Sequence, residues 1–318
     1  MKGLPGMLLV PALLAVAGPA LARDYPTRPI RVIGITGPGG TSDIFIRALG
    51  EELHKRWGQP LIVEHRPGAN GMIGAKACAE APPDGYTLCI LPGSGLNFNQ
   101  FLYKKVPYDA ERDFEPITNL MFSVQALVVN AELKVKSLDD LAAAAKARPL
   151  AYMAPVVPLV LFMQDFNKQH GVDIVRVPFR SGGDTATAIL SGAVPVAFLG
   201  ISNFISHIHA GAMTALAVDS VSRSPALPDV PTLTELGYRD TLRSFWGLLA
   251  PARTPQAIIH EVREEVARVV ADPAFRERQM IDRGLEPVAS TPEEFAAFLR
   301  RDRAAAARVV KEAGIEPQ

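Results

Sequence analysis

The chain has 318 residues, of which 48% are hydrophobic, with 33 basic and 33 acidic side chains. This apolar content excludes a generally disordered chain, and the length suffices for two domains of ordinary size. The balanced charge argues against a nucleic-acid-binding protein, which needs a basic face, so we expect no nucleic-acid partner.

The N-terminal segment has the features of a secretory signal peptide. Lys2 supplies the positive charge, residues 7–17 form a short apolar core, and Ala20-Leu21-Ala22 fits a cleavage site. The apolar core is shorter than the roughly 20 residues of a transmembrane helix. We therefore expect a signal peptide over residues 1–22, cleavage after Ala22 and export to the periplasm.

A glycine-rich loop, Gly37–Asp43, lies between a strand-like run at 30–35 and an amphipathic helix. The apolar stripe of that helix recurs every four residues, at Phe45, Leu49, Leu53 and Trp57. Backbone N–H groups at the start of such a helix favour a bound anion. An ordinary tight turn that feeds a capped helix explains the same residues equally well.

The ends of this helix carry recognisable signals. Thr41 or Ser42 can cap its start, and Asp43 suits its first turn. Gly58 can end it. Two nucleotide-binding interpretations of the loop fail: a dinucleotide fingerprint that starts at Gly37 requires glycine in place of Ser42, and a P-loop requires a lysine that is missing.

Other catalytic and metal-binding patterns also fail. Around Ser94, Pro92 and Leu96 stand where a nucleophile elbow requires glycines. His207 and His209 are two apart on an expected helix, so they point to different faces and cannot hold a metal together. We therefore expect no enzyme activity, no metal site and no cofactor.

Strands and helices alternate through most of the chain, without an internal repeat, and several strand-to-helix turns are rich in glycine. Besides the first loop, such turns lie at 66–71, 92–95 and 179–184. In an open parallel sheet, turns of this kind gather beyond the carboxyl ends of the strands, where ligands bind.

Two capping boxes lie in the C-terminal third. Thr232 with Glu235 predicts a short helix that Gly237 ends, and Thr291 with Glu294 predicts the start of the last helix.

The chain has two cysteines, which is too few for a disulfide framework. Cys78 lies in a helix-like stretch and Cys89 in the strand that follows. A bridge is conceivable in an oxidising compartment, but the pattern favours two separately buried, free thiols.

A series of motifs in one order resembles the substrate-binding proteins of tripartite tricarboxylate transporters, the Bug family. The resemblance covers the whole mature chain. The motifs that carry it are Tyr25–Ile30, Pro38–Asp43, Glu64–Gly71, Pro83–Leu88, Leu102–Asp109, Arg223–Thr232 and Trp246–Pro251.

The resemblance implies an α/β, two-domain periplasmic-binding-protein fold of the type II-like class, hinge-linked, with the ligand cleft between the domains. We expect residues 23–122 and 221–318 to form the first domain and 123–220 the second, with the hinge near Ser123 and Ser220. It also implies a monomer that captures a small carboxylate, with membrane transporter subunits as partners.

In such proteins, loop backbone amides, small hydroxyl groups and ordered waters bind the carboxylate. The resemblance assigns this role to Gly39, Gly40, Thr41, Ser42, Asp43, Asn70, Ser94, Gly95, Ser181, Gly182 and Gly183.

The chain departs from the family in the second domain. Residues 153–159 are apolar where the family has a small polar loop, and Leu199 stands where the family tends to have an aspartate. With Met153 and Leu199 in the ligand site, a second carboxylate would lack partners there. We therefore expect a carboxylate with an apolar portion rather than citrate. Alternatively, these side chains pack in the core, and Ser181–Gly183 receive a second carboxylate.

Two other functions are compatible with parts of the sequence. A periplasmic component that reports a solute to a membrane sensor kinase would have the same fold and cleft. A secreted hydrolase is a remote alternative, which turnover of an ester or amide would distinguish.

Overall fold

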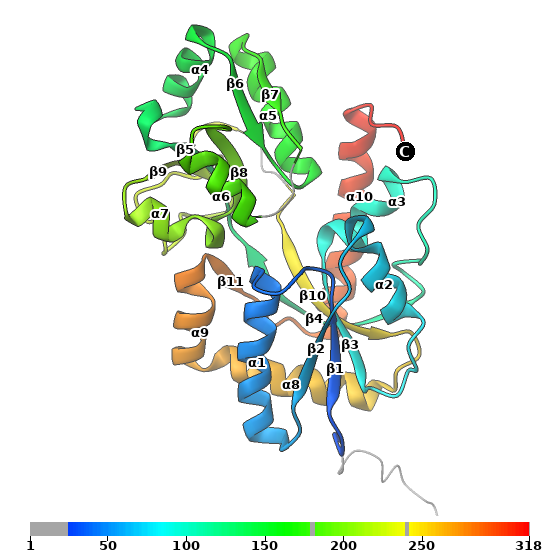
Figure 1. Cartoon of the computed structure of the whole chain (residues 1–318). Coiled ribbons are helices and arrows are strands. Elements are labelled where there is room, and N and C mark those ends of the chain that lie inside the picture. Colours follow the sequence, from blue (N-terminus) through cyan, green and yellow to red (C-terminus); the bar gives the residue numbers. More distant parts are fainter. Residues whose placement is uncertain (1–24, 179–181, 239–241, 318) are drawn as a thin grey trace, which may run out of the picture.

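The computed structural model describes residues 25–178, 182–238 and 242–317, which form two β-sheets flanked by helices (Figure 1). The predicted cleavage site after Ala22 lies outside the described residues. Within these three ranges, no helix has both the length and the apolarity to cross a membrane.

The larger sheet has the strand order β11-β4-β10-β3-β1-β2. Its strands are β1 (Ile30–Gly34), β2 (Leu61–His65), β3 (Thr87–Pro92), β4 (Phe114–Ser123), β10 (Phe245–Pro251) and β11 (Leu285–Pro287). Its helices are α1 (Thr41–Trp57), α2 (Met72–Ala79), α3 (Asn99–Leu102), α8 (Gln256–Ala271), α9 (Pro273–Gln279) and α10 (Pro292–Glu312).

The smaller sheet, green in Figure 1, has the order β7-β6-β8-β5-β9. Its strands are β5 (Gln125–Asn130), β6 (Leu150–Met153), β7 (Ile174–Arg176), β8 (Val196–Gly200) and β9 (Met213–Val218). Its helices are α4 (Leu138–Ala147), α5 (Val157–His170), α6 (Gly182–Leu190) and α7 (Ile205–His209).

Apart from β11, the two sheets share one topology. In the larger, β1 pairs in parallel with β2 and β3, and the antiparallel strand β10 lies between β3 and β4. In the smaller, β6 pairs in parallel with β7 and β8, and the antiparallel β5 lies between β8 and β9. Each antiparallel strand is the first that the chain forms after it crosses from the other sheet. The predicted two-domain periplasmic-binding-protein architecture is therefore confirmed.

Helix α1 forms as its apolar stripe predicts. Phe45, Leu49 and Leu53 are buried in the core of the larger sheet. Gly58 ends the helix with φ +68°, and its N–H donates to the His54 carbonyl oxygen.

The predicted N-cap of α1 is wrong by one or two residues. Gly40 occupies the cap position, and Thr41 and Ser42 are the first two residues of the helix. Their hydroxyl groups are engaged elsewhere, because Ser42 Oγ bonds to Thr36 Oγ1 and Thr41 Oγ1 bonds to Ser202 Oγ.

The C-terminal capping box is confirmed, since Thr291 and Glu294 exchange both hydrogen bonds at the start of α10. Thr232 and Glu235 also exchange both bonds, but the segment is a turn rather than the predicted helix. Gly237 adopts φ +83° as the last residue of that turn.

The segment after β9 remains attached to the smaller sheet. Leu227 packs in one apolar cluster of that sheet, and Leu233 and Tyr238 pack in the other. The Leu233 N–H donates to the Val218 carbonyl oxygen at the end of β9. The chain therefore follows the smaller sheet as far as Tyr238.

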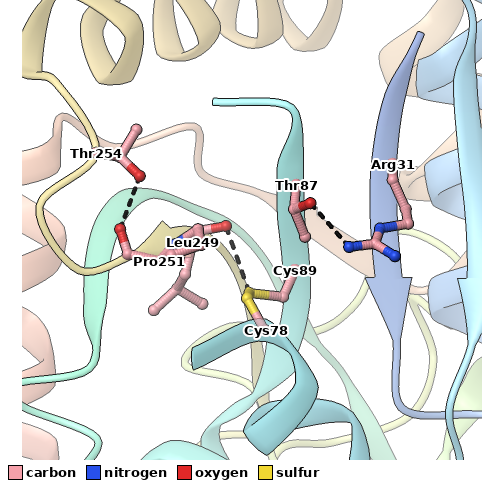
Figure 2. Close-up of a disulfide and its surroundings, with 7 residues drawn as sticks. All are labelled: Arg31, Cys78, Thr87, Cys89, Leu249, Pro251 and Thr254. Atoms are coloured by element: carbon pink, nitrogen blue, oxygen red, sulfur yellow. Dashed lines mark hydrogen bonds between the residues drawn. A yellow bond between two sulfur atoms is a disulfide. The ribbon is translucent and has the colours of Figure 1, made fainter. Parts of the chain in front are cut away.

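The prediction of free thiols is wrong, because Cys78 and Cys89 form a disulfide (Figure 2). Helix α2 packs directly on β3, which brings the two Cα atoms to 6.1 Å, a normal separation for a disulfide. The predicted burial of both residues is confirmed, since neither side chain is exposed. The two apolar segments were expected to pack separately, whereas they pack against each other.

Polar groups join the start of β5 to Asp219, the residue after β9, where the chain passes between the two sheets. The Gln125 N–H donates to Asp219 Oδ1 at 2.7 Å, and the Asp219 N–H donates to the Gln125 carbonyl oxygen at 3.0 Å. Asp219 is buried, and its Oδ2 has no hydrogen-bond partner among the described residues. Burial raises the pKa of Asp219 to about 7, although the Gln125 amide and the Arg243 charge act in the opposite direction.

This raised pKa predicts a measurable pH dependence of stability. An unfolded aspartate titrates near pH 4, so between about pH 4 and 7 the folded state binds more protons than the unfolded state. The contribution of Asp219 to the free energy of unfolding therefore falls as pH rises through this window. Asp219→Asn keeps the acceptor for Gln125 and removes the titration. In urea denaturation, we expect the variant to gain stability relative to wild type from pH 5 to pH 8. An identical pH dependence for both proteins would contradict the assignment.

Candidate ligand-binding site

The loops at the carboxyl ends of the parallel strands of the larger sheet lie against the smaller sheet. A direct contact joins them: Thr41 Oγ1 lies 2.9 Å from Ser202 Oγ. Ser202 belongs to a single helical turn, Ile201–Asn203, that follows β8. The first glycine-rich loop therefore lies between the two halves, as the sequence predicts.

The buried carboxylate of Asp43 fixes this first loop through hydrogen bonds. Asp43 Oδ2 accepts the Gly39 N–H at 2.8 Å, and Asp43 Oδ1 accepts Arg47 Nε at 2.7 Å. His65 Nε2 lies 3.2 Å from the same Oδ1. Because Asp43 is engaged on both oxygens and only 5% exposed, its role here is to position the loop.

Further bonds fix the base of the loop. His65 Nδ1 lies 2.8 Å from the Thr36 carbonyl oxygen and must donate to it, because a carbonyl oxygen only accepts. Thr36 Oγ1 lies 2.8 Å from Ser42 Oγ. A Cβ at Gly40 would lie 3.3 Å from Thr36 Oγ1, so this glycine faces the base of the loop.

The helix that follows presents unpaired donors. The N–H groups of Thr41, Ser42 and Asp43 precede the first intrahelical bond, from Ile44 N to the Gly40 carbonyl oxygen, and donate to no group in the described part of the chain. At a helix start, such N–H groups carry a partial positive charge that favours anions. The backbone at the start of α1 can therefore receive a carboxylate.

The equivalent position of the smaller sheet lacks this property. Helix α5 follows β6 as α1 follows β1. Its second residue, Pro158, has no N–H group, and the Leu159 N–H donates to the Val156 carbonyl oxygen. Among the described residues, the start of α1 thus offers more free backbone donors than the start of α5.

A polar chain fixes the second and third loops of the larger sheet. Asn70 Nδ2 donates to Asn99 Oδ1 at 2.7 Å, and Asn99 Nδ2 donates to the Tyr108 hydroxyl at 3.0 Å. Burial raises the pKa of Tyr108, so its hydroxyl stays protonated and donates to the Gly95 carbonyl oxygen. Asn70 and Gly95 are held by these bonds, with Asn70 in the left-handed region at φ +51°.

A cavity of about 50 Å³ lies between the halves, and we call it the interdomain pocket. Its polar side includes Asn70, Ser94 and Asp302, and its apolar side includes Phe98, Leu102 and residues 155–158. Val157 of the second half also packs in one apolar cluster with Phe98 and α10. Ser94 and Asn70 are thus brought together, as the sequence predicts.

The remaining predicted residues fall into two groups. Met153 and Leu199 pack in an apolar cluster of the smaller sheet, and Leu199 is only 8% exposed. Gly182 and Gly183 begin α6, whereas Ser181 lies outside the described residues.

Sequence reasoning missed several residues at this site. Ser202 lies two residues after the end of the buried strand β8, so its polarity after an apolar run was an available signal. Asp302 had no such signal, because α10 reaches the pocket only through tertiary packing. Arg243 and Ser244 also line the pocket, just before β10.

The chain matches known proteins over nearly its full length. The model of the family described as "Tripartite tricarboxylate transporter family receptor" matches residues 45–315. Protein BugT of Bordetella pertussis is 33% identical over 309 residues, which cover 95% of this chain and 94% of BugT.

Solved structures give the same result. A Rhodopseudomonas palustris protein solved with adipate has a TM-score of 0.85 and 28% identity, with 93% of this chain and all of that chain covered. MatC from the same organism, solved with bound malate, has a TM-score of 0.78 and 26% identity, with 90% of this chain and all of that chain covered. The chain therefore belongs to the tripartite tricarboxylate transporter receptor family, the family of the Bug proteins.

Proposed function

We propose that this protein is a periplasmic solute-binding protein that captures a small carboxylate between its domains and passes it to a tripartite tricarboxylate-type membrane transporter. The observation that carries the proposal is the start of α1, where the N–H groups of Thr41, Ser42 and Asp43 have no partner among the described residues. Relatives solved with adipate and with malate support a carboxylate ligand. In this proposal the protein acts as a monomer, catalyses no reaction and needs no cofactor.

The ligand has one carboxylate at the start of α1 and a substantial apolar portion. Apolar side chains from both halves, including Phe98 and Val157, line the interdomain pocket. Burying apolar ligand surface there gains about 25 cal/mol per Å². Burying an unpartnered second carboxylate would instead cost several kcal/mol.

Ligand binding bends the molecule at the crossings between the sheets. The predicted crossings near Ser123 and Ser220 coincide with the polar groups that join Gln125 to Asp219. Because Leu227, Leu233 and Tyr238 pack on the smaller sheet, we place the end of the second domain near Tyr238 rather than at 220.

A ligand panel tests the proposal. Calorimetry with benzoate, adipate and citrate should show tighter binding of benzoate and adipate than of citrate, because citrate brings extra carboxylates to an apolar wall. Tightest binding of citrate would contradict the apolar portion. Absence of binding by every carboxylate would contradict the function.

A single-residue variant tests the role of the backbone. Thr41→Pro removes one N–H group at the first helical position, where proline is tolerated, and the extended Gly40 suits a following proline. Thr41→Val is the matched control, since it loses the same hydroxyl and keeps the N–H group. A hydrogen bond to a charged group is worth about 1.5–3 kcal/mol, so Thr41→Pro should bind the best ligand of the panel at least about tenfold more weakly than Thr41→Val. Equal affinities of the two folded variants would refute the backbone site.

A further inference from the structure

A large groove separates the two halves where α5 of the second half faces α10 of the first. Its volume is about 970 Å³, and its walls are α5 and the C-terminal half of α10. Figure 1 shows α5 and the upper end of α10 to the right of the crossing strands, and α1 with α6 and α7 to their left. The groove therefore lies on the opposite side of the crossings from the start of α1.

The charges on the two walls of this groove are complementary. Four charged side chains line it, two on each helix: Asp165 and Lys168 on α5, and Arg308 and Glu312 on α10. All four are exposed, and no ion pair in the described part of the chain includes any of them. Each wall thus presents one free positive and one free negative charge to the other.

The positions of these charges along the helices place opposite signs together. Helix α5 starts at the interdomain pocket, and α10 passes that pocket at Asp302, so both helices run away from it along the groove. At 1.5 Å per residue, Asp165 lies about 12 Å along α5 from the pocket and Arg308 about 9 Å along α10. Lys168 lies about 17 Å along α5 and Glu312 about 15 Å along α10. The negative charge of each pair is therefore nearly level with the positive charge across the groove.

The contacts between the halves allow this groove to close. On the other side of the crossings, Thr41 Oγ1 lies 2.9 Å from Ser202 Oγ, so the halves touch at the start of α1. Close to the crossings, Val157 packs in one apolar cluster with Phe98. A rotation about this central contact that separates Thr41 from Ser202 moves α5 toward α10, because the two places lie on opposite sides of the crossing strands (Figure 1).

We propose that α5 and α10 form an electrostatic latch, which closes when the cleft at the start of α1 opens. In the closed latch, Asp165 pairs with Arg308. Lys168 pairs with Glu312 about one turn further along the helices. The ion pairs stabilise the open, ligand-free state, and they break when a ligand draws the halves together at α1.

The latch lowers the affinity for ligand, because only molecules that leave the latched state can close on it. This inference rests on the proposed function and adds residues, remote from the start of α1, that set how tightly the ligand binds.

Calorimetry with adipate and benzoate tests the latch through affinity. Asp165→Lys places a positive charge opposite Arg308, which destabilises the latched state, so the variant should bind both acids at least about threefold more tightly than wild type. Asp165→Lys/Arg308→Asp exchanges the two charges and restores the pair, so its affinity should return to within about twofold of wild type. Glu132→Lys makes the same charge change at an exposed site of the second half outside the groove and should leave the affinity unchanged.

Distances measured without ligand test the latch independently of binding. Asp173→Cys, just beyond α5, and Lys311→Cys on α10 provide exposed sites for two spin labels. The native Cys78 and Cys89 are buried in their disulfide, so only the introduced thiols react. In double electron–electron resonance, adding Asp165→Lys should shift the ligand-free distances to longer values. A saturating concentration of adipate or benzoate, whichever binds more tightly, should shift the distances in the same direction without that substitution.

The outcomes separate the latch from the function beneath it. Ligand-free distances that Asp165→Lys leaves unchanged would overturn the latch and make the four charges solvated surface groups. Tighter binding that the exchanged-charge variant does not reverse would overturn the pairing of Asp165 with Arg308. Failure of wild type to bind benzoate, adipate and citrate would contradict the proposed function, whereas the ligand-free distances would still decide whether the latch exists.

Discussion

The double crossing of the chain between the two sheets is the constraint on which the rest of the structure depends. Strand β5, the first after the chain leaves the larger sheet, lies inside the smaller one, and β10, the first after the return, lies inside the larger. The larger sheet is not complete until the chain has crossed in both directions, because β10 and β11 follow the return. The carboxyl ends of both sets of parallel strands therefore meet, and glycine-rich loops from one half lie against the other.

The helix starts at α1 and α5 differ in chemistry, although the two helices occupy equivalent positions in the two sheets. At α1, Asp43 accepts the Gly39 N–H and Ser42 bonds to Thr36, while the N–H groups of the first helical residues have no partner among the described residues. At α5, Pro158 and the bond from Leu159 remove most of those donors. This asymmetry favours a ligand with one charged end and one apolar body over a symmetrical polycarboxylate.

The sequence predicted the local elements of this fold well. The stripe of α1, its end at Gly58 and the capping box at Thr291 depend on residues close in sequence, so periodicity and spacing reveal them. The shared topology of the two sheets left no trace as a repeat, because different sequences can form the same strand order.

Apart from the turn at 232–237, which the capping box predicted as a helix, the errors and omissions involve contacts between elements. The Cys78–Cys89 bridge depends on how α2 packs on β3, and the cap of α1 depends on hydroxyl partners as distant as Ser202. Asp302 enters the pocket from a helix about 200 positions after its partner Asn97. Short-range patterns carry no information on such pairs, so the site was only partly predictable: its loops were found, and its opposing residues were not.

The central claim is that the two domains close on a carboxylate, and small-angle X-ray scattering tests it most directly. Curves should be recorded for the protein alone and with a saturating concentration of the tightest acid found by calorimetry, in the same buffer. The account predicts a smaller radius of gyration in the presence of ligand, because a hinge at the crossings brings the domains together. Superimposable curves under conditions where calorimetry shows saturation would contradict it.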